Sequence, residues 1–199
     1  DAACDWSSDV CSSDLSIVFI SGLSGSGKST LLNIINGLIP EVIDGKLGGE
    51  LLIGGKSKVM MNERSALIGN VFQNPRSQFF TTNTTAELVF AMENFGVSKP
   101  EMEMRLKALI KKYKLEYLLD RDIYELSSGE RQMLALMSDL IMNPQVVIFD
   151  EPSANLDYGN AMRLRSQIEE LKSEGITVLV ADHRCRSEEH TSELQSHAA

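Results

Sequence analysis

The sequence predicts an α/β fold in which helices cover both faces of a parallel β-sheet. The first observation is a set of strand-length apolar segments without regular polar alternation, which is typical of strands buried on both faces: Ser16–Ser21, Ala66–Phe72, Gln145–Phe149 and Ile176–Ala181. The second is that segments with helical spacing, such as Ala161–Glu174, separate these strands, as the crossovers of a parallel sheet require.

Length and composition suit a single compact domain. The chain has 199 residues, of which 43% are hydrophobic and 24% charged, and this excludes disordered and collagen-like classes. Three cysteines are too few for a disulfide-stapled miniprotein and give no metal-ligand spacing. No apolar run approaches the ~20 residues of a membrane span. The net charge of -9 disfavours nucleic acid as a partner, because binding to phosphate backbones normally requires a basic face.

Between the strands, the pattern predicts the remaining elements in order. A helix is expected at Lys28–Asn36, with Gly37 as its stop, and a glycine-rich exposed β-hairpin at Glu41–Lys56. From about Thr85 to Leu119 the pattern is helical, amphipathic and rich in methionine, with a break near Pro100. The S-x-x-E spacing of Ser127 to Glu130 has the form of a capping box and predicts that another helix starts there.

Both ends of the chain differ from its middle. Asp5–Leu15 and Arg186–His197 show no apolar period of about 2 or 3.6 residues. The C-terminal string can be encoded by DNA that resembles a common short-read sequencing adapter, and the reverse complement of the same oligonucleotide encodes Asp5–Leu15. We therefore expect residues 1–15 and 186–199 to be assembly artefacts around a gene fragment. Two ordinary polar tails are the alternative.

Phosphate binding is predicted at the first strand–helix turn. Residues Gly22–Ser29 fit G-x-x-x-x-G-K-[ST], the P-loop pattern, directly after a strand and at the start of a helix. Backbone N–H groups in such a loop surround phosphate oxygens, assisted by the positive end of the helix dipole. Lys28 would contact the β- and γ-phosphates, and the Ser29 hydroxyl would bind Mg²⁺. A glycine-rich turn with a solvated lysine is the structural alternative.

A pair of carboxylates follows a second strand. Val146–Phe149 leads into Asp150 and Glu151, at the end of the strand where open α/β sheets bind ligands. Asp150 would hold Mg²⁺ through water, and Glu151 could polarise an attacking water. Taken alone, two such acids fit a helix cap equally well, and His183 after the last strand is more often structural. The nearby P-loop favours the catalytic interpretation.

Taken together, the motifs resemble those of ABC-type ATPases across residues 16–185. Their order and spacing match that family in the P-loop, Gln73, Leu126–Glu130 (LSSGE), Phe149–Pro152 (FDEP), Leu156-Asp157 and His183. The resemblance implies a P-loop NTPase core with an inserted α-helical subdomain at about 76–141 and a truncated N-terminal β-subdomain. The stretches at Asn36–Lys56 and Gln73–Phe80 look most like energy-coupling-factor ATPases, which power vitamin or metal-ion uptake.

The resemblance also implies individual roles. Gln73 would contact Mg²⁺ or water, and His183 would lie at the γ-phosphate, so these two join Glu151 as catalytic candidates. ATP would be bound by P-loop residues, by Ser127 and Gly129 of the signature motif of a partner subunit, and by Asp157 at the interface. The P-loop set is Gly22, Ser24, Gly25, Ser26, Gly27, Lys28, Ser29 and Thr30, and the metal set is Ser29, Gln73 and Asp150. Ser128 departs from the family, which usually has a glycine there.

These implications lead to one expected function and two alternatives. We expect a subunit that binds and hydrolyses Mg-ATP on the cytoplasmic face of a membrane, paired with a second ATPase domain and an integral membrane transporter subunit, without nucleic acid. One alternative is a soluble ABC ATPase that acts on ribosomes or DNA, although the 53 positions from Gln73 to Leu126 leave no room for a long coiled-coil insertion. The other is an inactive, truncated translation product.

Overall fold

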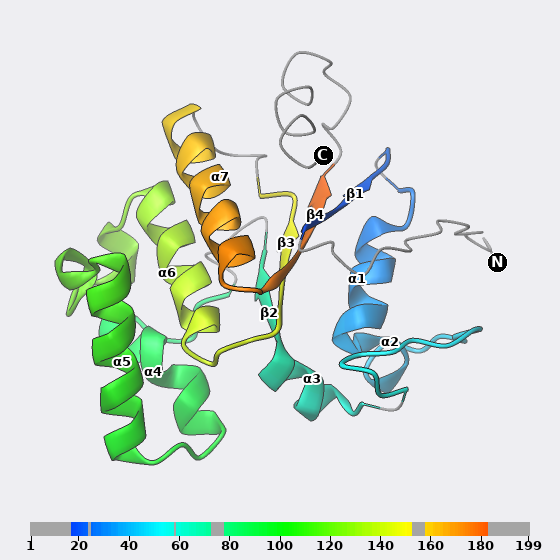
Figure 1. The fold of residues 1–199 in the computed structure, drawn as a ribbon, viewed down its shortest axis with the longest axis horizontal. Coiled ribbons are helices and arrows are strands. Elements are labelled where there is room, and N and C mark those ends of the chain that lie inside the picture. The colour runs from blue at the N-terminus through cyan, green and yellow to red at the C-terminus, as the bar shows by residue number, and fades with distance from the viewer. Residues whose placement is uncertain (1–16, 24, 58, 73–77, 153–157, 183–199) are drawn as a thin grey trace.

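In the described part of the chain, four parallel strands form a central sheet (Figure 1). The computed structural model describes residues 17–23, 25–57, 59–72, 78–152 and 158–182. The spatial order of the strands is β1-β4-β3-β2 and every pairing is parallel, which confirms the predicted sheet. Their bounds are β1 Ile17–Ser21, β2 Ile68–Val71, β3 Val146–Asp150 and β4 Thr177–Asp182.

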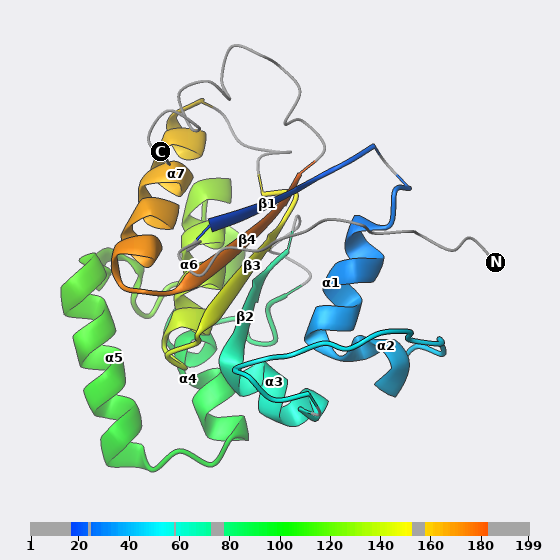
Figure 2. The same cartoon turned by 45° about the vertical axis from the view of Figure 1, so that its right-hand side comes forward.

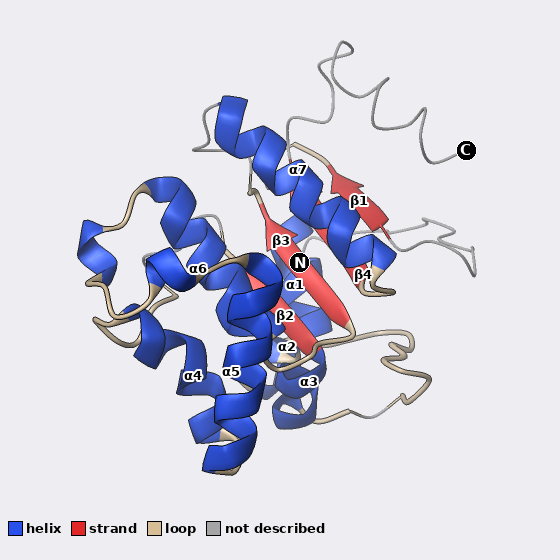
Figure 3. Ribbon diagram, turned by 60° about the vertical axis from the view of Figure 1, so that its left-hand side comes forward, coloured by secondary structure: helices blue, strands red, loops and turns tan. Residues whose placement is uncertain are grey.

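Helices cover the two faces of the sheet separately (Figures 1 and 2). One face carries α1 (Lys28–Asn36) with α3 (Met61–Leu67), and the short α2 (Leu38–Glu41) contacts α1. The opposite face carries α6 (Ser128–Leu140) and α7 (Tyr158–Ser173). Two further helices, α4 (Thr84–Asn94) and α5 (Lys99–Tyr113), pack outside α6 (Figure 3). Short 3₁₀ turns at Glu116–Leu118 and Ile123–Glu125 lead into α6.

Successive residues of the strands point into two different cores. In β3, Val147 and Phe149 join the larger cluster beneath α6 and α7, whereas Ile148 joins the smaller cluster with Leu32 of α1. β4 behaves in the same way, with Val178 in the larger cluster. Because side chains alternate between the faces of a strand, burial on both sides requires apolar residues at consecutive positions. This explains why the sequence of these strands lacks polar alternation.

The helix starts follow local rules that the sequence displays. Ser127 accepts a hydrogen bond from the Glu130 N–H, and the Glu130 side chain accepts one from the Ser127 N–H, so the predicted capping box is confirmed. Pro100 does not break a helix but lies in the first turn of α5, where its missing N–H costs nothing. The interruption of the predicted Thr85–Leu119 stretch therefore lies at 95–98, between α4 and α5.

Two predicted elements differ from the structure. The β-hairpin at Glu41–Lys56 is wrong, since no strand forms in residues 42–56 and the pairing is a single bridge between Ile53 and Lys56. Gly54 and Gly55 occupy this turn at positive φ, and most of the segment is exposed, so little burial offsets the backbone entropy of ordering glycines. The strand predicted at Ala66–Phe72 begins only at Ile68, because α3 continues to Leu67.

Several expectations concern segments beyond the part described. The ends predicted to be artefacts, 1–15 and 186–199, lie outside the described residues. Within the predicted helical subdomain, residues 78–141 contain α4, α5 and α6. Among the helices that the structure describes, none combines the length and apolar character needed to cross a bilayer.

Candidate functional site

The carboxyl ends of the strands bring the predicted site residues to one edge of the sheet. Ser21 pairs with Asp182, and Asp150 pairs with Ala181, so β1, β4 and β3 end side by side. The P-loop follows β1 directly, and Glu151 follows β3. Four candidates, Ser24, Gln73, Asp157 and His183, lie outside the described residues. Gln73 comes two positions after β2, and His183 comes one position after β4.

The turn from β1 to α1 has the backbone that a phosphate loop needs. Gly25 and Gly27 have φ of 80° and 92°, which side chains rarely adopt. A Cβ atom at Gly22 would lie 2.5 Å from the Ser26 hydroxyl oxygen, so a side chain there would displace the Ser26 hydroxyl from the loop. Gly27 caps α1 without a side-chain hydrogen bond, which leaves first-turn N–H groups for an anion.

Lys28 is held against this loop. Its Nζ donates to the Gly22 carbonyl at 2.7 Å and to the Leu23 carbonyl at 3.2 Å, and the residue is 5% exposed. Burial of an ammonium group is costly unless hydrogen bonds and opposite charge compensate. The loop carbonyls supply part of this compensation, and an anionic ligand would supply more. Ser29 and Thr30 follow on α1 and are exposed.

Asp150 and Glu151 are both half-buried at the end of β3. Burial raises the pKa of the Asp150 carboxyl, the Glu151 carboxylate raises it further, and the Lys28 ammonium lowers it. The structure thus brings Lys28 and Glu151 within electrostatic range of Asp150. Glu151 has a left-handed backbone with φ of 49°, and its N–H donates to the Ala181 carbonyl at 2.7 Å. Such strain in a non-glycine residue is common at functional sites.

The oxygen donors fit Mg²⁺ bound together with a phosphate ligand. Mg²⁺ prefers oxygen ligands, keeps several waters and is commonly held by one or two carboxylates plus phosphates. The Ser29 hydroxyl and the Asp150 carboxylate are donors of this type. In the described part of the chain, no three His, Cys, Asp or Glu side chains gather as a metal site. Two such donors leave the remaining coordination positions of Mg²⁺ to phosphate oxygens and waters.

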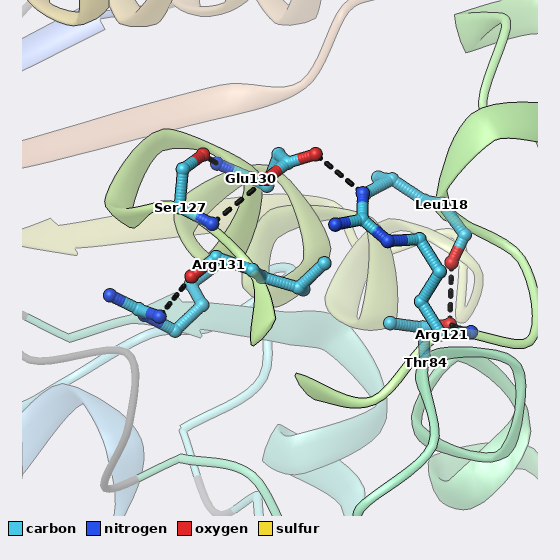
Figure 4. A network of polar contacts seen from close by, with 7 residues as sticks. Thr84, Leu118, Arg121, Ser127, Glu130 and Arg131 are labelled. Atoms are coloured by element: carbon cyan, nitrogen blue, oxygen red, sulfur yellow. Dashed lines mark hydrogen bonds and ion pairs between the residues drawn. The ribbon is translucent and has the colours of Figure 1, made fainter. Parts of the chain in front are cut away.

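The Ser127–Glu130 motif lies at the start of α6, in a network of polar contacts (Figure 4). Glu130 Oε2 accepts the Ser127 N–H at 2.8 Å, and Glu130 Oε1 pairs with Arg121 Nη1 at 2.6 Å. The pKa of Glu130 is lowered by the Ser127 N–H and by Arg121. Arg131 Nη1 donates a hydrogen bond to the carbonyl of Leu126, the residue that precedes Ser127, and so fixes the backbone there. Gly129 is half-buried in the first turn of α6.

The helices that follow the P-loop and the Ser127–Glu130 motif lie on opposite faces of the sheet (Figures 1 and 2). The helix after the P-loop, α1, contributes Leu32 to the smaller core, whereas α6 contributes Leu134 and Met137 to the larger one. Within one chain, the helix that begins at the P-loop and the helix that begins at this motif are therefore on different sides of the sheet.

Sequence reasoning missed two charged residues that connect distant segments of the chain. Arg121 precedes Glu130 by nine positions across a 3₁₀ turn, a spacing that has no helical or strand period and so gives no signal. Asp139 on α6 accepts hydrogen bonds from the Asn70 N–H of β2 at 3.0 Å and from Gln78 Nε2 at 3.3 Å. A single acid on a mostly apolar helix face was the available hint for Asp139.

Comparison with protein families and curated proteins gives a consistent result. The family described as ABC transporter matches residues 9–154. A curated relative from Treponema denticola, named as an ABC transporter ATP-binding protein, is 44% identical over 170 residues, which is 84% of this chain. The chain spans 35% of that relative's length.

Solved structures agree with this match. The cbiO1 protein of Clostridium perfringens, described as part of the ABC transporter complex cbiONQ, superposes with a TM-score of 0.73 at 30% identity, over 84% of this chain and 66% of that one. MJ1267, an ATP-binding cassette of an ABC transporter in its ADP conformation, gives a TM-score of 0.68 at 26% identity, over 86% of this chain and 70% of that one.

Proposed function

This chain belongs to the ABC transporter family, and from that membership we propose that it is an ATP-binding domain that hydrolyses Mg-ATP to drive transport across a membrane. The observation that carries the proposal is the meeting of the P-loop, Lys28, Asp150 and Glu151 at one edge of the sheet. A phosphate-binding loop and two carboxylates at this edge fit the hydrolysis of a nucleotide.

The candidate site residues have distinct roles in this proposal. The N–H groups of Gly25 to Thr30 bind the phosphates, and Lys28 supplies positive charge to the β- and γ-phosphates. Ser29 and Asp150 would hold Mg²⁺, which neutralises charge on the phosphate oxygens. Glu151 accepts a proton from the attacking water as that water bonds to the γ-phosphorus and the bond to the bridging oxygen breaks. Gln73 and His183 are proposed to orient the water and the γ-phosphate.

A second ATPase domain completes the site. Ser127 and Gly129 are at the start of α6, which packs on the opposite face of the sheet from α1, the helix that follows the P-loop, and this supports a pair of domains in which each motif closes on the partner's ATP. Asp157 is proposed to lie at this interface. Loss of the γ-phosphate would then remove contacts between the domains and reopen the pair.

Transport of a vitamin or a metal ion is the finer proposal. It rests on the sequence of Asn36–Lys56 and Gln73–Phe80, which look like those of energy-coupling-factor ATPases. The similarity to cbiO1, part of the cbiONQ complex, agrees with this choice. The domain would then dock on an integral membrane subunit at the cytoplasmic face of the membrane, with no role for nucleic acid.

Two variants test the nucleotide site. Replacement of Lys28 by Ala removes the charge beside the loop, and we expect ATP affinity, measured by calorimetry, to fall at least about tenfold. Lys56→Ala, on an exposed turn, is the matched control. Glu151→Gln is expected to bind ATP but to lower the hydrolysis rate by about 10²–10⁴. Unchanged ATP affinity in Lys28→Ala would contradict the proposed site.

A further inference from the structure

The network in Figure 4 points to a role for a residue outside the family motifs. We propose that Arg121 is a positioning residue for the Ser127–Glu130 motif, which it fixes in the capping-box geometry and whose negative charge it neutralises where α6 faces ATP. This inference rests on the proposed ATPase function. It assigns a task to a side chain that does not itself contact the nucleotide.

The backbone of Arg121 is anchored before its side chain reaches α6. The Arg121 N–H donates to Thr84 Oγ1 at 3.1 Å, and the Arg121 carbonyl accepts the Thr84 N–H at 3.0 Å. Thr84 is fully buried at the start of α4, and its hydroxyl donates to the Leu118 carbonyl at 2.5 Å. The guanidinium group therefore extends from a rigid support, so little side-chain entropy remains to be lost when it pairs.

Arg121 completes the hydrogen bonding of Glu130. One Glu130 oxygen accepts the Ser127 N–H at 2.8 Å, and the other pairs with Arg121 Nη1 at 2.6 Å. The Ser127 hydroxyl meanwhile accepts the Glu130 N–H at 3.2 Å. A hydroxyl that accepts through oxygen still has its hydrogen to donate. With Glu130 held on both sides, Ser127 keeps that hydrogen, and the N–H groups of Ser128 and Gly129 remain directed to the helix start, for a phosphate of the partner's ATP.

The second task of Arg121 is electrostatic. The contacts with Ser127 and Arg121 lower the pKa of Glu130, so this carboxylate is charged at neutral pH. An uncompensated negative charge in the first turn would repel the triphosphate that this helix end receives. Arg121 compensates that charge, because its Nη1 atom lies 2.6 Å from Glu130 Oε1. Because both side chains are about one-quarter to one-third exposed, solvent screens the pair and the expected effect is moderate.

The test is ATP hydrolysis by the full chain as a function of ATP concentration. Arg121→Ala leaves Glu130 charged and unpaired, and we expect KM for ATP to rise by about two- to fivefold with a smaller change in kcat. Adding Glu130→Gln removes the charge, so the double variant should return toward the wild-type KM. Arg121→Lys keeps a positive charge, so its KM for ATP should lie between those of wild type and Arg121→Ala. Arg105→Ala, which breaks the Glu101 ion pair on α5, is the matched control and should leave KM unchanged.

Each outcome decides one question. An inactive wild-type chain would overturn the proposed function, whereas an active chain whose KM is unaffected by Arg121→Ala would overturn this inference alone. A purely structural role predicts that Glu130→Gln fails to rescue Arg121→Ala. Urea unfolding of wild type, Arg121→Ala, Glu130→Gln and the double variant gives a second readout: additive shifts in the unfolding midpoint would show that Arg121 and Glu130 do not act together, whether or not ATP is hydrolysed.

Discussion

At the scale of the residue, hydrogen bonds to backbone atoms hold the charged residues at the carboxyl edge of the sheet. Lys28 donates to two loop carbonyls, and Glu151 is fixed by its own N–H on the neighbouring strand. The left-handed backbone of Glu151 sends the chain away from the line of β3 immediately after Asp150. Adjacent carboxylates can thereby take different positions at the site.

Among the residues that the structure describes, Asp139 has a carboxyl group whose ionisation depends strongly on folding. Burial raises its pKa to about 8, against the smaller opposing effects of the Asn70 N–H and the Gln78 amide. An aspartate in an unfolded chain titrates near pH 4. The folded state therefore binds more protons than the unfolded state between these two values, and the free energy of unfolding falls as pH rises through this window.

Replacing Asp139 by Asn tests this dependence. The variant retains an oxygen acceptor but cannot ionise, so its free energy of unfolding relative to wild type should increase from pH 5 to pH 8, by up to about 1.4 kcal/mol per pH unit. Urea unfolding at several pH values measures it. Asp44→Asn, in an exposed segment, serves as the control. A difference between Asp139→Asn and wild type that stays constant over this range would contradict the raised pKa.

At the scale of the element, caps decide where the helices begin. The Asn83 side chain accepts hydrogen bonds from the N–H groups of Thr85 and Ala86 at 2.9 and 3.1 Å and starts α4. Asn83→Ala should lower the free energy of unfolding by about 1 kcal/mol, because two first-turn donors lose their acceptor. Thermal or urea unfolding measures this cost. Asn83→Asp, which retains an acceptor, should remain close to wild type, and an equal loss in both variants would argue against capping.

Local chemistry explains which elements could be predicted. The capping box of α6, the glycine stop of α1 and the apolar strands β3 and β4 follow from neighbouring residues, and the structure bears them out. The β-hairpin predicted at Glu41–Lys56 was wrong because a strand there would need a partner strand that short-range patterns do not identify. The beginning of β2 was displaced because apolar residues at the end of α3 read equally well as a strand.

The residues of the candidate site also divide into those that local motifs predict and those that depend on packing. Gly22, Lys28, Asp150 and Glu151 were predictable because each follows a strand in a motif whose spacing is fixed by backbone geometry. Arg121 and Asp139 act between elements that are distant in sequence, through contacts created by packing alone. No spacing in a single sequence encodes such contacts.

At the scale of the whole molecule, the helices that follow the phosphate loop and the Ser127–Glu130 motif pack on opposite faces of the sheet. The proposed function therefore requires two domains per closed site. The Glu151→Gln variant, which binds ATP but hydrolyses it slowly, should shift from one copy toward two when ATP is added, as measured by light scattering after size exclusion. Lys28→Ala combined with Glu151→Gln is the control and should not shift. If the molecular mass of Glu151→Gln in solution is the same with and without ATP, two copies of this chain do not form the composite site.

The close approach of α6 to β2 also constrains how this sequence can diverge. A Cβ atom at Gly69 would lie 2.9 Å from the Cβ of Asp139, so the two positions share one small space. A side chain at position 69 therefore requires either that α6 and β2 move apart or that position 139 lacks a Cβ atom. Relatives that keep this close approach and have a residue other than glycine at 69 should accordingly carry glycine at 139, which makes this pair an expected site of covariation.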